Sequence, residues 1–88
     1  MEEVRIARKG GVVRDEEGKL LLVNEDNEAY IASEMVVYIW NACDGKTLDE
    51  LTKEIAEAVN RDAGEVKEAL SELIGKLKEA KLVEYTAP

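Results

Sequence analysis

The feature that most constrains the fold is a change of hydrophobic period at Ser33. Before it, the short apolar runs VVR, LLLV and AYIA are separated by the acidic segments DEEGK and NEDNE. Asn, Asp and Gly tolerate the backbone angles of tight turns, so these runs predict strands at about 11–15, 19–24 and 28–32. After Ser33, apolar residues recur at helical spacing. We therefore predict an α+β fold, in which a three-stranded antiparallel sheet is followed by three helices.

Each predicted helix has a recognisable start. Ser33 can cap a first helix over about 34–43. The apolar positions of this helix are Val36, Ile39, Trp40 and Cys43. Thr47 and Glu50 form a capping-box pattern for the second helix, and Asp62 caps the third in the same way. The closing LVEY can pack as a terminal strand.

The stretch IWNACDGKTLDEL contains the single cysteine of the chain. Gly45 can take the left-handed conformation common where helices end, so the stretch predicts a joint between two helices. Cys43 lies on the apolar stripe and no His, Lys or Arg adjoins it, which favours a buried structural thiol over a nucleophile. We interpret Asp44 as a turn residue rather than a catalytic acid.

Composition limits the chemistry that we expect. The 88 residues predict one domain, 1–88, in which 1–9 form a short charged N-terminal arm. One cysteine and no histidine leave no metal-ligand set, and the sequence has neither a phosphate-binding loop nor a nucleophilic triad. We therefore expect no catalytic residue, no metal and no cofactor. No apolar run has the length of a signal peptide or a membrane span, so we expect a cytoplasmic protein without a membrane partner.

Charge argues against nucleic acid as a partner. The formal net charge of −8 repels phosphate backbones. The third helix, the candidate recognition helix of a winged-helix protein, begins DAGEVKE, whereas a DNA reader needs basic or amide side chains there.

The predicted sheet offers a positive signal. The middle run, 20–23, is apolar at consecutive positions, yet the helices can cover only one face of so small a sheet. The other face needs the N-terminal arm, a second subunit or a partner. The run at 28–32 ends the meander and should present an unpaired backbone edge, a setting in which an extended peptide can add as a strand. The alternatives are that this edge closes a dimer or is shielded.

The sequence resembles the PqqD family, small proteins of pyrroloquinoline quinone biosynthesis, and the related precursor-peptide recognition elements. The likeness extends from about Gly11 to Glu84 and is carried by LLLVNEDNEAYIAS, IWNACDGKTLDELTKEI and VKEALSELIGKLKEAKLVE. Its most specific part is IW followed by DGKT at the spacing of the family.

This resemblance implies a winged-helix-like scaffold that does not bind DNA. The leader segment of a precursor peptide would lie as a fourth strand against the third strand, in a groove shared with the third helix. It would then be delivered to a radical SAM or other modifying enzyme. The implied peptide-binding residues are Glu28, Ala29, Tyr30, Ile31 and Ala32 on the strand, and Val66, Lys67, Leu70, Leu73 and Ile74 on the helix. Some of the helix positions must belong to the core.

The sequence thus predicts a non-catalytic peptide-binding chaperone. Two other functions stay open. One is an adaptor or dimeric accessory subunit that binds an enzyme through its apolar sheet face, and the other is a winged-helix DNA-binding regulator. The negative charge further predicts that the peptide or enzyme partner presents basic residues.

Overall fold

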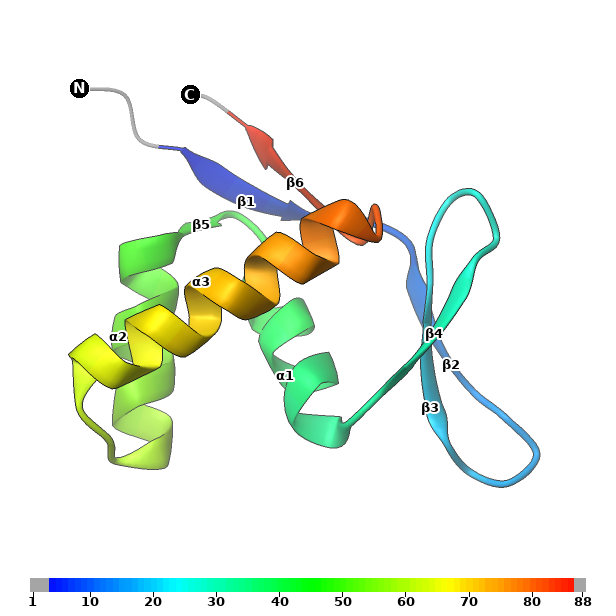
Figure 1. Cartoon of the computed structure of the whole chain (residues 1–88), viewed down its shortest axis with the longest axis horizontal. Coiled ribbons are helices and arrows are strands. Elements are labelled where there is room, and N and C mark those ends of the chain that lie inside the picture. Colours follow the sequence, from blue (N-terminus) through cyan, green and yellow to red (C-terminus); the bar gives the residue numbers. More distant parts are fainter. Residues whose placement is uncertain (1–3, 87–88) are drawn as a thin grey trace.

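The structure is a computed structural model that describes residues 4–86. In chain order its elements are β1 (Arg5–Arg8), β2 (Gly11–Arg14), β3 (Leu20–Val23), β4 (Ala29–Ala32), α1 (Glu34–Ala42), β5 (Lys46–Thr47), α2 (Leu48–Val59), α3 (Ala63–Glu79) and β6 (Val83–Thr86). Strands β2, β3 and β4 form the first sheet, and β5, β1 and β6 form the second. Figure 1 shows the first sheet at one end of the molecule and helix α2 at the other. The predicted α+β fold is confirmed, with a second small sheet added to it.

The first sheet is the predicted meander, with both strand pairs antiparallel. Residues directly opposite one another in such pairs point to the same face. The register therefore places Val12, Leu22 and Tyr30 on one face and Val13, Leu21 and Ile31 on the other. Leu22 is buried in the core, whereas Ile31 is 75% exposed. The first face thus packs toward the helices, and we call the second the open face.

The second sheet was missed by the sequence analysis. Residues 1–9 were expected to form a charged arm, but Arg5–Arg8 form β1, which pairs with β6 on one side and β5 on the other. Ile6, the one fully buried residue of this strand, is only 2% exposed. Residues 1–3 lie outside the described part of the chain. The C-terminal strand β6 confirms the prediction for LVEY.

Gly10 carries the chain from one sheet into the other. Its φ is +79°, in the left-handed region that favours glycine. A Cβ at this position would lie 2.1 Å from the backbone oxygen of Val23. The close approach therefore requires glycine, and it brings β3 against the link between the two sheets.

The three helices begin where their caps predicted. The Ser33 side chain accepts the Val36 N–H, and the Asp62 side chain accepts the Glu65 N–H. At the start of α2, Thr47 and Glu50 form the complete capping box. Satisfying the free N–H groups of a first turn in this way stabilises each helix start by about 1 kcal/mol.

The hydrophobic core lies between the helices and the two sheets. Its most deeply buried large side chains are Trp40, Leu22, Leu51, Ile74 and Leu82. The indole Nε1 of Trp40 donates to the Leu82 carbonyl oxygen at 2.9 Å, so the aromatic ring is buried with its polar atom satisfied. Within residues 4–86, no helix combines the length and the apolar character that a membrane span requires.

Candidate functional site

Strand β4 lies at the edge of the first sheet, because among residues 4–86 it pairs with β3 alone. Its other edge presents backbone N–H and C=O groups that no described strand takes up. Ala29, Tyr30 and Ile31 are exposed and Ala32 is partly buried. An unpaired edge of this kind accepts an extended chain as a further strand.

Asn24 organises the turn that leads into β4. Its side chain is 4% exposed, and its Oδ1 accepts the backbone N–H groups of Asp26 and Glu28 at 3.0 and 2.9 Å. Its Nδ2 donates to Glu28 Oε1 and, at 2.7 Å, to the Ala80 carbonyl oxygen at the end of α3. This one amide therefore ties the start of β4 to the third helix.

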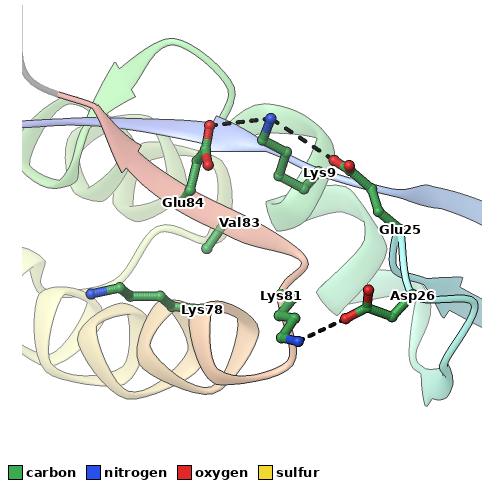
Figure 2. A pocket seen from close by; sticks show the side chains of 7 residues that line it. All are labelled: Lys9, Glu25, Asp26, Lys78, Lys81, Val83 and Glu84. Carbon is green, nitrogen blue, oxygen red and sulfur yellow. Dashed lines mark hydrogen bonds and ion pairs between the residues drawn. The ribbon is translucent and has the colours of Figure 1, made fainter.

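A pocket of about 440 Å³ lies beside this turn (Figure 2). It is lined by Lys9, Glu25, Asp26, Lys78, Lys81, Val83 and Glu84. The Nζ of Lys81 lies 2.7 Å from an Asp26 oxygen, and that of Lys9 lies 3.1 Å from a Glu84 oxygen. The hydrogen bonds to these carboxylates raise the pKa values of both lysines. The third lysine, Lys78, places its Nζ 4.6 Å from the centre of the Tyr85 ring. Because Lys9 and Lys81 already have carboxylate partners, we interpret the pocket as a polar contact region between the two sheets.

Three of the five implied third-helix positions lie in the core. These are Val66, Leu70 and Ile74, whose exposed fractions are 7%, 2% and 2%. Ile74 also lines an apolar pocket of about 310 Å³ beside the second sheet, together with Val4, Ile6, Leu48, Ser71 and Tyr85. Their burial means that these side chains hold α3 in place, and only a displacement of the core would expose them to a peptide.

The other two implied helix positions differ from each other. Lys67 is exposed, and its Nζ lies 3.0 Å from Asp49 Oδ1, which links the start of α3 to α2. Leu73 is partly buried and packs against the edge of the core. Of the five, Leu73 is thus the apolar position that retains surface for a ligand.

Cys43 and Asp44 have structural surroundings. The Cys43 side chain is fully buried, as predicted, and its Sγ donates to the Trp40 carbonyl oxygen. Burial, followed by the nearby Asp44 charge, raises the pKa of the thiol to about 11. Asp44 Oδ1 accepts the Arg8 N–H at 3.0 Å, and Gly45 has a φ of +78°, as the predicted joint requires. Among residues 4–86 no three His, Cys, Asp or Glu side chains gather closely enough to hold a metal ion.

Sequence reasoning missed the role of Asn24. An Asn at the start of a turn is a known signal for side-chain hydrogen bonds to the following N–H groups. That signal predicts the bond to Asp26. It does not predict the bond to Ala80, because the two residues lie 56 positions apart and only the folded chain brings the C-terminal end of α3 to this turn.

Comparison with known proteins shows which family has a sequence of this kind. The sequence matches the profile of the family described as coenzyme PQQ synthesis protein D (PqqD) over residues 18–83. The chain belongs to the PqqD family. Comparison with curated protein sequences gave no match.

Among solved structures, this PqqD family member is similar to the PqqD truncation of PqqCD from Methylobacterium extorquens, determined in solution by NMR. The TM-score is 0.67 and the sequences are 15% identical, over 93% of this chain and 88% of the other. The protein from Methylobacterium extorquens is described as a functional, stand-alone recognition element for ribosomally synthesised and post-translationally modified peptides. At this identity the likeness establishes the shared fold.

The PqqD match includes strands β3 and β4 and the three helices of the described chain. Strand β1 lies outside the matched residues. Strand β4, which carries the candidate edge, therefore lies within the part of the chain that matches the family.

Proposed function

We propose that this PqqD family member is a non-catalytic peptide-binding chaperone. The leader segment of a ribosomally made precursor peptide adds to β4 as a fourth strand, and the protein presents it to a modifying enzyme, such as a radical SAM enzyme, in the cytoplasm. The observation that carries this proposal is the unpaired β4 edge within a PqqD fold.

The chemistry of the edge suits binding rather than catalysis. Hydrogen bonds along a paired strand supply sequence-tolerant affinity, and side chains on either side of the strand supply selectivity. On β4 those side chains are the exposed Tyr30 and Ile31. With a pKa of about 11, the Cys43 thiol stays protonated at neutral pH and offers no nucleophile.

An NMR titration tests the proposal. Isotopically labelled protein is mixed with synthetic precursor peptides encoded near its gene, and amide shifts are followed along the chain. We expect the largest shifts at 28–32, with smaller ones on the exposed side of α3. Saturating peptide that leaves 28–32 unshifted would refute strand addition.

A backbone control makes the test specific to strand pairing. Alternate N–H groups of an added strand point toward β4 and away from it. N-methylation of the peptide N–H groups that point toward β4 should abolish binding. The same number of methyl groups on the alternate N–H groups, which point away, should leave binding largely intact. An equal loss of affinity in the two methylated peptides would indicate binding through side chains alone.

The open face supports a second candidate function, an adaptor or dimeric subunit that binds an enzyme directly. Val13 is 49% exposed and Ile31 is 75% exposed on that face. An enzyme that perturbs Val13 and Leu21 without any peptide would favour this candidate. DNA regulation receives no such support, since Glu65 and Glu68 are exposed at the start of α3 and repel phosphates.

A further inference from the structure

The open face carries an apolar row that ends at the β4 edge. Val13, Leu21 and Ile31 lie directly opposite one another across the three strands. Val13 is 49% exposed, Leu21 is partly buried and Ile31 is 75% exposed. A strand added beside β4 places one of its own side chains directly beside Ile31, on the same face. An apolar side chain at that position covers the most exposed large hydrophobic residue of the described chain.

Two carboxylates bracket this edge. Glu28 immediately precedes β4, and Glu34 begins α1 after the single residue Ser33. Both are exposed, and among residues 4–86 neither forms an ion pair. The Glu28 carboxylate accepts a hydrogen bond from the neutral Asn24 amide, and its charge helps to raise the pKa of Lys81 from beyond ion-pair distance. By contrast, the neighbouring Asp26 is paired with Lys81.

The carboxylates oppose pairing of β4 with a second copy of the chain. In the antiparallel register that sets Ile31 beside Ile31 of the other copy, each Glu28 is brought toward Glu34 of the other, since both positions lie three residues from Ile31. Both residues lie just outside β4, and like charges brought close to one another repel. A strand with basic residues on both sides of its apolar centre meets the same carboxylates favourably.

We propose, on the basis of the proposed function, that the strand accepted at β4 belongs to a peptide with an apolar residue beside Ile31 and a Lys or Arg on each side of it, facing Glu28 and Glu34. This assignment names the chemistry of the guest strand at the β4 edge. The apolar residue extends the row of Val13, Leu21 and Ile31 onto a fourth strand.

A display selection tests the assignment while the natural peptide is still unidentified. Random peptides of fourteen residues are selected on immobilised full-length protein, and the winners are synthesised and mapped by NMR. We expect winners that shift the amides of 29–32 to share a central Val, Ile, Leu or Phe flanked by Lys or Arg. Their affinity should fall as salt concentration rises.

Reversing the charges of Glu28 and Glu34 makes the test more specific. Selection on the E28K/E34K variant should replace the flanking basic residues by Asp or Glu, and the original winners should bind it about threefold to tenfold more weakly. The E28Q/E34Q variant provides the same test with less disturbance of the turn and of α1, and its NMR spectrum reports folding. The control is E57K/E68K, which changes the net charge equally at exposed positions on α2 and α3.

Four outcomes would overturn the assignment. Selected peptides that shift 29–32 but have no apolar centre or no basic flanks would contradict the assigned chemistry. So would peptides whose affinity falls as much for the E57K/E68K control as for E28K/E34K. Strand addition at β4 would still stand in both cases. No winner that shifts 29–32 would remove the proposed function as well. Concentration-dependent shifts of 29–32 in the free protein would show that a second copy occupies the edge.

Discussion

The two small sheets of this protein contain three strands each, yet they are held in place differently. In the second sheet, Ile6 of β1 and Val83 of β6 are each 2% exposed and belong to the core. In the first sheet only Leu22 is buried to that degree, and Val12 and Tyr30, which flank it, remain 41% and 40% exposed. Burial thus anchors the second sheet at one residue on each of two neighbouring strands, and the first sheet at a single central residue.

Because of this difference, the second sheet is tied into the stable core and the first sheet is better suited to bind a partner. Apolar area removed from water is the main source of folding free energy, at about 25 cal/mol per Å². The first sheet keeps much of its apolar area in water, where a partner can still remove it. Its position depends on Leu22 and on the polar ties of Asn24. A sheet held this way can offer both an edge and a face without loss of the core.

The largest expected effect compares the same substitution in the two sheets. Ile6→Ala removes buried methyl groups and leaves a cavity, so we expect it to lower the free energy of unfolding by about 2–5 kcal/mol. Ile31→Ala alters an exposed side chain and should change it by less than about 0.5 kcal/mol. Urea denaturation of both variants measures the difference. Similar losses would mean that the open face is covered in solution.

A smaller effect is expected in the turns of the first sheet. Asn24→Ala leaves buried polar groups without partners and releases the tie to Ala80, which should cost about 1–3 kcal/mol and speed amide exchange in β4. Asp15→Ala is the control, because Asp15 likewise accepts the backbone N–H groups of Glu17 and Lys19. Its carboxylate makes those bonds within its own turn. Equal costs would show that the bond to α3 contributes nothing.

The smallest effect is a pH dependence in the core. The Cys43 thiol has a pKa of about 11, compared with an ordinary value of 9.0, because the side chain is buried. The unfolded chain therefore loses this proton first as the pH rises. The contribution of Cys43 to stability is complete below about pH 9 and is lost as the pH rises through about 11. Cys43→Ala should flatten the fall of unfolding free energy over this interval.

Thiol labelling checks the same environment directly. A disulfide reagent at pH 8 should modify Cys43 no faster than the whole protein unfolds. Rapid labelling of the folded protein would show that the thiol is accessible and that its raised pKa has another origin.

The sequence predicted the elements whose signals are local. Thr47 and Glu50 lie three residues apart, so a capping box can be read directly from the chain and is found in the structure. Strand β1 has no such signal, since RIAR contains a single large apolar residue between arginines. Its partners lie at 46–47 and 83–86, and only the folded chain brings them to it.

Only the edge position of β4 was predictable in this way, and the peptide-binding residues stay a prediction. That β4 ends the meander follows from the order of the strands, and the structure confirms it as the edge of the first sheet. The helical pattern of α3 combines core and surface positions in one apolar stripe. It therefore could not separate Val66, Leu70 and Ile74, which are buried, from Leu73, which keeps exposed surface.

By itself the sequence determined the order of strands and helices, the helix starts, the acidic charge and the resemblance to the PqqD family, since each depends on residue type and short spacing. Tertiary structure decided that the second sheet forms, that Asn24 reaches Ala80, and that the row ending at Ile31 stays open. Those outcomes depend on which distant segments share the limited buried volume of a small domain. Packing, rather than local preference, decides how that volume is shared.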